Sequence, residues 1–200
     1  MEAFWNLLLG RLILPDIEMP PKQILDIGCG SGIYCMELAH DLPYTHIHGV
    51  DIFPLQHITP PANCQFYVAD VLEGLPFPDQ QFDFIHSRDI HSGIPPDKWV
   101  PYLTEVYRLL RPGGWLQLAE MDPWPACDDG TLRPDSAWIR YLVAMNEISD
   151  QSNIKVFGLG PELRGYVEEA GFVNITETCK KCPLGKWTKG ITYCSWLIVL

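Results

Sequence analysis

Four residues near the start of the chain have the types and the spacing of a ligand-binding turn. Asp26, Gly28, Gly30 and Gly32 alternate with other residues in the stretch 23–33, QILDIGCGSGI. Apolar residues on both sides of Asp26 predict a buried strand, and a helical pattern follows the last glycine. Glycine has no Cβ, so the backbone of such a turn can approach a ligand closely, and the first N–H groups of the helix are left free as donors. We therefore predict a ligand site between this strand and this helix.

The glycine spacing distinguishes between classes of ligand. The dinucleotide fingerprint G-x-G-x-x-G requires its third glycine at position 33, where the chain has Ile33. The pattern found is instead acid-x-Gly-x-Gly-x-Gly. Glycine-rich turns also occur with no ligand, so the prediction depends on the strand before the turn, the helix after it and a second acidic strand end at Asp51.

Asp51 follows a second strand pattern, at residues 46–50. In open parallel sheets, ligands bind at the carboxyl ends of strands. A carboxylate at such an end can accept hydrogen bonds from both hydroxyls of a ribose, which makes Asp51 a candidate nucleoside-binding residue. The structural alternative is that Asp51 caps the helix that follows.

The rest of the chain continues to alternate strands and helices. This alternation predicts an α/β fold, with a Rossmann-like, doubly wound and mostly parallel sheet and right-handed crossovers. The segment Arg111-Pro112-Gly113-Gly114 is interpreted as the sharp end of a helix. The expected helices are 32–40, 99–110, 136–149 and 161–170, and the expected later strands are 64–69, 82–86, 115–120 and 172–178. In the first of these helices, Ile33, Met36 and Leu38 are expected to face inward.

Composition and charge restrict the domain organisation and the class of partner. Two hundred residues, 47% of them apolar, fit a single domain over 1–200. The net charge of −11 argues against nucleic acid as the main partner, because backbone binding needs clustered Lys and Arg. The apolar run within 1–21 is too short and too interrupted to span a membrane and lacks the features of a signal peptide, so we expect a short helical cap over the ligand cleft. Residues 121–157 break the alternation and are expected to form a lid-like insertion.

The chain has seven cysteines, an odd number scattered along its length. This usage predicts reduced thiols and a cytoplasmic or nuclear location. Cys179 and Cys182 form a C-x-x-C pair in a strand-like stretch, and no second pair completes a zinc site, so we interpret them as incidental thiols. The histidines also lack ligand spacing, and we predict no metal site.

Several segments, taken in order, resemble one family. ILDIGCGSG, HGVDIFP, FYVADVLEGLPFPDQQFDFIHSR, VYRLLRPGGWLQLAEMD and EEAGFV are similar to class I methyltransferases that depend on S-adenosyl-L-methionine (SAM). Within that class, LLLGRLIL, LRPGGWLQLAE and KCPLGKW resemble the fungal secondary-metabolism methyltransferases of the global-regulator type. The resemblance covers about residues 4–187. It implies SAM as cofactor and methyl transfer to an oxygen or nitrogen of a small-molecule acceptor. Alternatively, it implies a SAM-binding regulatory or scaffold protein of low or no activity that works through protein partners.

The resemblance also implies roles for individual residues. Asp26 would lie near the amino group of SAM, directly or through water, and the glycine turn would admit the methionine end. Asp51 would hold the ribose, and Asp70 with Val71 would contact the adenine, although an aspartate at Asp70 also favours a simple turn. The cofactor site implied in this way consists of Asp26, Gly28, Cys29, Gly30, Gly32, Asp51, Ile52, Asp70, Val71, Ser87 and Arg88.

Methyl transfer depends mainly on alignment, and a general base is optional. For a hydroxyl acceptor, His91 in the loop after strand 82–86 is the candidate base. His86 is a second candidate, and its place at the end of a strand is equally consistent with packing. Glu120 either orients an acceptor or makes a structural hydrogen bond. The candidate acceptor contacts are the aromatic residues Trp124, Trp138 and Tyr141.

The chain departs from the family pattern after Trp187. Residues 188–200 become apolar, β-branched and aromatic from Ile191 onward. They either supply an antiparallel seventh strand through a shortened connection or are the product of an altered gene structure that leaves an exposed edge. In the second case, part of the roof over the substrate would be missing.

Overall fold

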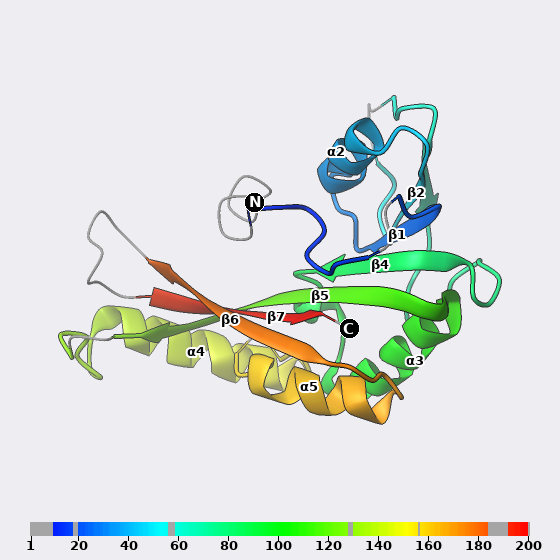
Figure 1. Cartoon of the computed structure of the whole chain (residues 1–200). Helices are drawn as coiled ribbons and strands as arrows, with labels where there is room; N and C mark the ends of the chain where they lie inside the picture. Colours follow the sequence, from blue (N-terminus) through cyan, green and yellow to red (C-terminus); the bar gives the residue numbers. More distant parts are fainter. Residues whose placement is uncertain are drawn as a thin grey trace.

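The fold is a seven-stranded sheet with helices on both faces (Figure 1). The computed structural model describes residues 10–17, 20–55, 59–127, 130–155, 157–183 and 192–199. The strands are β1 (Gln23–Ile27), β2 (His46–Asp51), β3 (Cys64–Val68), β4 (Phe82–Arg88), β5 (Leu110–Ala126), β6 (Thr176–Pro183) and β7 (Thr192–Val199). The helices are α2 (Ile33–Asp41), α3 (Trp99–Leu109), α4 (Ala137–Gln151) and α5 (Gly160–Glu169), with short 3₁₀ turns at His91–Gly93 and Pro96–Lys98.

The strand order is β3-β2-β1-β4-β5-β7-β6. The strands β1 to β5 pair in parallel, whereas β7 pairs antiparallel with both β5 and β6. The predicted doubly wound, mostly parallel sheet is therefore confirmed. The expected seventh strand is also confirmed for residues 192–199, while 188–191 and 200 lie outside the described residues. The order reverses between β1 and β4, and ligands of open α/β sheets bind at such a switch point.

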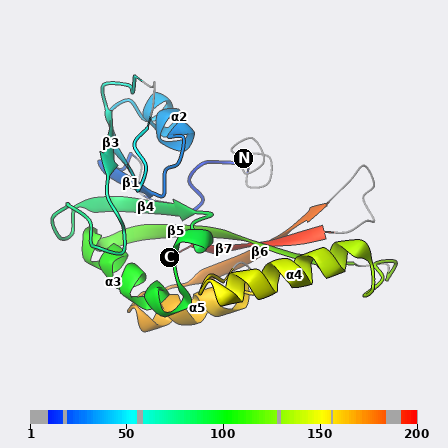
Figure 2. The same ribbon diagram turned by 180° about the vertical axis from the view of Figure 1, so that it is seen from behind.

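Helices lie on both faces of the sheet, as Figures 1 and 2 show from opposite sides, and the buried apolar residues form two clusters. Side chains alternate between the faces of a strand. Leu25 and Ile27 of β1 pack in the larger core with α3 and α5, and Ile24 packs in the smaller core with α2. Asp26 shares the α2 face with Ile24, because Cys35 of α2 donates to it. The alternation thus places one carboxylate inside the smaller core.

The glycines after α3 have a different role from the one predicted. The helix ends at Leu109, and Arg111-Pro112-Gly113-Gly114 lies within β5, where the pairing with β4 shifts between Phe82 and Phe84. Gly113 has a φ of +77°, and a Cβ on Gly114 would lie 3.0 Å from the carbonyl oxygen of Arg111. Glycine is therefore needed for a bulge in the strand rather than for a helix cap.

Four other expectations are corrected. Residues 121–126 continue β5, so the insertion begins later than 121. Its helix α4 starts after Ser136, because the Oγ of Ser136 caps the helix by accepting from the Ile139 N–H at 3.3 Å. The last predicted strand starts at 176 rather than 172, because Phe172 packs edge to face on Tyr107 in the core. Cys179 is disulfide-bonded, so the expectation of a reduced thiol is wrong there. The inward-facing residues of α2 are Tyr34, Cys35, Leu38 and Ala39, whereas Ile33, expected to face inward, is 41% exposed.

The N-terminal segment crosses the α2 side of the sheet without forming a helix over residues 10–17. The carbonyl oxygen of Leu12 accepts from the Tyr34 hydroxyl at 2.8 Å, and the Leu14 N–H donates to Gln117 Oε1 at 2.8 Å. The predicted cap is thus non-helical where it is described, and residues 1–9 lie outside the described residues. None of the helices in the described part of the chain has the length and apolar character that a membrane span requires.

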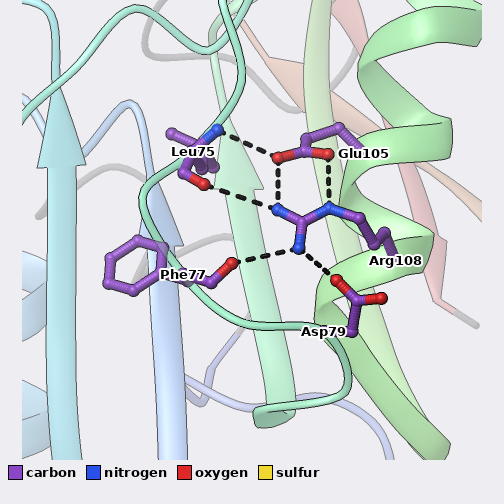
Figure 3. A network of polar contacts seen from close by, with 5 residues as sticks. All are labelled: Leu75, Phe77, Asp79, Glu105 and Arg108. Carbon is purple, nitrogen blue, oxygen red and sulfur yellow. Dashed lines mark hydrogen bonds and ion pairs between the residues drawn. The ribbon is translucent and has the colours of Figure 1, made fainter.

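Arg108 of α3 fastens the loop between β3 and β4 (Figure 3). Its guanidinium donates to Glu105 at 2.8 and 2.6 Å, to Asp79 at 2.6 Å and to the Phe77 carbonyl at 3.0 Å. Glu105 in turn accepts from the Leu75 N–H at 2.9 Å. The hydrogen bond from Arg108 is the main cause that lowers the pKa of Glu105. The guanidinium therefore holds the loop to the helix directly through Asp79 and Phe77, and Glu105 adds the Leu75 amide.

Replacing Arg108 should destabilise the fold. We expect Arg108→Ala to lower the free energy of unfolding by roughly 2 kcal/mol, because several hydrogen bonds to charged groups and carbonyls are lost together. The control is Arg133→Ala, which removes an exposed pair with Asp135 and should cost less than about 1 kcal/mol. Urea unfolding of both variants measures the difference, and equal losses would show that the network around Arg108 contributes no more than a surface ion pair.

Candidate functional site

The glycine turn connects β1 to α2 with backbone that only glycine adopts readily. Gly28, Gly30 and Gly32 have φ values of +72°, +52° and +73°. The Gly28 and Cys29 amides both donate to the carbonyl oxygen of Val50, at 2.9 and 3.0 Å, and the Gly32 amide donates to that of Cys29 at 2.8 Å. These three amides are thus bonded within the protein, and the expectation that the first N–H groups of α2 are left free as donors stays a prediction. The Gly28 and Cys29 amides secure the turn to the end of β2.

The three glycines differ in the space around them. A Cβ on Gly28 would lie 2.4 Å from Cγ2 of Ile90, and a Cβ on Gly32 would lie 2.5 Å from Leu55. A Cβ on Gly30 would meet no atom of the described residues within 4 Å. Packing thus requires glycine at the first and third positions. At Gly30 the turn instead opens toward space that a ligand can occupy.

Asp51 joins the turn to the end of β2. Its Oδ2 accepts from the Gly30 N–H at 2.8 Å, and its Oδ1 accepts from the Phe53 N–H at 3.0 Å. The next two residues present apolar surface, with Ile52 at 55% and Phe53 at 74% exposure. The structure therefore brings the predicted residues Gly30, Asp51 and Ile52 together at one edge of the sheet. The structural role of Asp51 is to bind loop amides, and a carboxylate oxygen with one such bond retains acceptor capacity.

A cavity of about 260 Å³ lies beside the turn. Residues 28–31 form one wall, and Asp26 and Tyr34 lie next to them. The end of β4 supplies the opposite wall, with His86, Arg88 and Asp89. The predicted residues Asp26, Gly28, Cys29, Gly30 and Arg88 thus share one cavity. Gly32 does not line it.

Asp26 and His86 form a buried pair next to this cavity. The distance from His86 Nδ1 to Asp26 Oδ1 is 2.7 Å, and both side chains are at most 4% exposed. Asp26 Oδ2 accepts from the Cys35 thiol at 3.2 Å. Asp26 was predicted to lie near the amino group of SAM, and both of its carboxylate oxygens are engaged by the protein. From the sequence, His86 was considered only as a base or as a packed residue, and its pairing with Asp26 was not predicted. The feature that could have indicated this pairing is a histidine inside the apolar strand pattern FDFIHSR.

Alternation along β4 separates Ser87 from its neighbours. His86 and Arg88 face the cavity, whereas the Ser87 side chain is fully buried on the α3 face, beside the Tyr102 hydroxyl. Burial is the main cause that raises the pKa of Tyr102. The structure thus places the side chain of Ser87 away from the cavity that its two neighbours line.

Asp70 and Val71 follow β3 next to the end of β2. The Ala69 N–H donates to the carbonyl oxygen of Asp51 at 3.0 Å, which holds the two strand ends together. Asp70 Oδ1 accepts from the Leu72 N–H at 2.9 Å, the pattern of an Asx turn. Val71 packs partly buried against the larger core. The turn-forming role of Asp70 is confirmed, and its contact with adenine stays a prediction.

Glu120 at the end of the central part of β5 organises the loop after β4. It is 1% exposed and accepts from the Ile90 N–H at 3.1 Å, the His91 N–H at 3.3 Å and His91 Nδ1 at 2.7 Å. Ile90 of the same loop packs over Gly28. Of the two roles considered for Glu120, the structural hydrogen bond is confirmed. It links the loop of His91 to the glycine turn.

The His91 and Glu120 pair has shifted pKa values. Burial lowers the pKa of His91, but the hydrogen bond and charge of Glu120, with the charges of Asp89 and Asp122, outweigh it and raise that pKa. Burial raises the pKa of Glu120, against the opposing effect of His91. A histidine oriented by a carboxylate and partly open to solvent is suited to proton transfer at its other nitrogen.

Asp89, His91 and Glu120 also form a group that chain spacing did not reveal. One ligand-type atom from each lies within 4.8 Å of the others, close enough to share a metal ion. The residues come from different elements, so only the fold brings them together. The hydrogen bonds of Glu120 account for this proximity without an ion, and the absence of a metal site stays a prediction.

The three aromatic residues predicted to contact the acceptor form two separate ring pairs. Trp124 lies edge to face with Phe157, at a centroid distance of 5.8 Å. Trp138 and Tyr141 stack on each other on α4, also at 5.8 Å, and remain 39% and 54% exposed. Figure 2 shows α4 beside β6 and β7, at the end of the sheet away from β1 and β3. The contact of Trp124, Trp138 and Tyr141 with an acceptor stays a prediction.

Comparison with known sequences agrees with this geometry. Residues 24–114 match the methyltransferase domain family. The chain is 35% identical to the methyltransferase pytC of Aspergillus terreus over 190 residues, which are 94% of this chain and 57% of that protein. It is 30% identical to the secondary metabolism regulator laeA of Aspergillus fumigatus, over 82% of this chain and 44% of that protein. The chain thus spans about half the length of these curated relatives.

Solved structures share the fold. A SAM-dependent methyltransferase from Methanosarcina mazei aligns with a TM-score of 0.66 and 21% identity, over 94% of this chain and 96% of that chain. A phosphoethanolamine N-methyltransferase from Haemonchus contortus, solved with SAM, aligns with a TM-score of 0.64 and 18% identity, over 98% of this chain and 52% of that chain. At these identities the likeness shows the fold alone.

The contact between Glu120 and His91 predicts a measurable pKa change. Glu120→Gln removes the charge that raises the pKa of His91, so that pKa should fall, as followed by NMR titration of the histidine ring. Because folding raises this pKa, the contribution of His91 to stability is complete below the ordinary value of about 6.5 and is lost as the pH rises through the raised value. The variant should lack this pH dependence. An unchanged His91 titration in Glu120→Gln would contradict the assignment, and the other histidine signals serve as the internal control.

Proposed function

Residues 24–114 match the methyltransferase domain family, and from this match we propose that the chain binds SAM and transfers the methyl group to a small-molecule acceptor. The observation that carries the proposal is the open position at Gly30, with the Asp51 carboxylate bonded to the amide of that same residue. A ligand in which a nucleoside is joined to an amino acid through sulfur would have its ribose at Asp51 and its amino-acid end in the cavity beside the turn.

The residues of the site fit such a ligand. Asp51 offers carboxylate oxygens to two ribose hydroxyls. Ile52 presents apolar surface beside it, and Asp70 and Val71 follow the neighbouring strand, as an adenine pocket requires. The cavity between the turn and Arg88 takes the amino-acid end. When bound, SAM supplies a methyl group on a sulfonium, which is already a strong electrophile.

The protein's contribution is then mainly alignment. Holding two reactants in line is worth roughly 7–11 kcal/mol of the barrier, without any covalent step by the protein. Glu120 fixes the loop of residues 89–91 over Gly28, so the loop and the turn keep a constant relation. This arrangement supports an acceptor position between His91 and the cavity.

His91 is the proposed base for a hydroxyl acceptor. Glu120 engages Nδ1, which leaves Nε2 as the nitrogen that can take a proton. The raised pKa strengthens the imidazole as a base and moves its neutral form to higher pH. An amine acceptor that is already neutral needs no such base, so His91 also bears on the acceptor class.

The regulatory alternative rests on relatives named secondary metabolism regulators. Such a protein would also bind SAM, so SAM binding alone does not separate the two functions. The relative with higher identity is named a methyltransferase, and the polar pair of His91 and Glu120 beside the turn favours catalysis. We therefore favour the enzyme. The cytoplasmic or nuclear location stays part of the proposal.

The open space at Gly30 gives a direct test. Gly30→Val should abolish binding of S-adenosylhomocysteine (SAH), because the side chain would enter the ligand space. Gly113→Val is the matched control: Gly113 also has a positive φ and no neighbour within 4 Å, but it lies in the β5 bulge. Calorimetric titration compares both variants with the native chain. Normal SAH binding by Gly30→Val would show that the turn is not the site.

Asp51 gives a second test. Asp51→Ala should weaken SAH binding by about 100-fold or more, because two hydrogen bonds to a charged group are worth roughly 1.5–3 kcal/mol each. Asp135→Ala, which removes an exposed acid of a surface pair, is the control and should bind as the native chain does. The same titration measures both. Unchanged affinity in a folded Asp51→Ala variant would overturn the ribose assignment.

A further inference from the structure

His86 is buried and only half satisfied. It is 1% exposed, its Nδ1 lies 2.7 Å from Asp26 Oδ1, and its ring stacks on Tyr34 with centroids 3.9 Å apart. Its Nε2 is buried and has no hydrogen-bond partner among the residues that the structure describes. A buried polar atom left unpaired is destabilising, so such an atom beside a cavity points to a missing partner.

The pairing with Asp26 determines what that partner must be. A carboxylate only accepts hydrogen bonds, so Nδ1 carries the proton that it shares with Asp26. In this tautomer Nε2 is an acceptor. The missing partner is therefore a donor, and the negative charge of Asp26 behind the ring favours a donor that is cationic.

Asp26 is almost entirely enclosed by the protein and is bonded through both of its oxygens. Its Oδ1 is engaged by His86, its Oδ2 accepts from Cys35, and the residue is 3% exposed. The carboxylate therefore acts on the cavity through the imidazole ring that it orients. His86 lines the cavity, and Asp26 fixes the tautomer of His86.

The cavity also has a positive charge, opposite in sign to that of Asp26. The Arg88 guanidinium is 5.3 Å from the centre of the Tyr34 ring, the same ring that stacks on His86, and Arg88 lines the same cavity. The amides of Gly28, Cys29 and Gly32 already donate to protein carbonyls, so they are not the donors for an anionic group. Arg88 is the cation on this wall, and Asp26 with Asp89 supplies the negative charge. This pattern matches a zwitterion.

We propose that His86 Nε2 accepts a hydrogen bond from the ammonium group of the ligand's amino-acid end, with Arg88 facing the carboxylate. This inference rests on the proposed binding of SAM and assigns its amino-acid selectivity to His86. His86 is then a binding residue, and Asp26 is a positioning residue that acts through it. The site should discriminate strongly against adenosyl ligands that lack the ammonium group.

The test compares three probes by calorimetry with the full chain: SAH, its deaminated analogue, and 5′-methylthioadenosine, which lacks the amino-acid end. The native chain should bind SAH about 10- to 100-fold more tightly than the deaminated analogue, the size expected for one hydrogen bond to a charged group. His86→Asn keeps a donor near Asp26 but does not reach the Nε2 position. It should reduce that preference to about 1 while binding methylthioadenosine as before.

His86→Gln provides the rescue, because its amide reaches the Nε2 position and offers an acceptor oxygen. It should recover part of the preference that His86→Asn loses. The proposal is overturned if the native chain binds SAH and the deaminated analogue equally, a result that depends on no variant. It is also overturned if His86→Asn keeps the preference and is merely less stable, which would make the pair structural. A native chain that binds none of the three probes would overturn the proposed function itself.

Discussion

The loops at the carboxyl ends of the strands depend on carboxylates for their backbone hydrogen bonds. A loop that leaves a parallel strand carries N–H groups that the sheet no longer pairs, and buried amides must be satisfied. Asp51 accepts the amides of Gly30 and Phe53, and Glu120 accepts those of Ile90 and His91. The acids at this edge therefore hold the site together before any ligand arrives.

Asp51 and Glu120 each hold two loop amides, and these hydrogen bonds explain how the site is preorganised. The amide of Gly30 and the carboxylate of Asp51 are bonded to each other, so the turn and the end of β2 form one unit. The loop of Ile90 packs over Gly28 and is fixed to β5 by Glu120. The ends of β1, β2 and β4 are thereby coupled to β5, and alignment of two reactants requires such a fixed arrangement.

Near the candidate site, His86 and His91 are each oriented by a carboxylate, and their surroundings give them different roles. His86 pairs with Asp26 inside the smaller core, where its second nitrogen lies buried beside the cavity. His91 pairs with Glu120 near the surface, where its side chain is 15% exposed. The first arrangement suits recognition of a fixed group of the ligand, and the second suits proton exchange with an acceptor and with water.

The sequence by itself determined the elements and their order, because glycine spacing, apolar periodicity and strand-end acids act locally. It predicted the turn of Gly28 to Gly32, the place of Asp51 and the parallel sheet. Only the tertiary structure decided that Asp26 contacts His86, that Glu120 contacts His91, and that Ser87 faces away from the cavity. These outcomes depend on the register between strands and on which face each residue occupies. The glycines at 113 and 114 show the same limit: a local pattern that suits a helix cap became a bulge because β4 lies beside it.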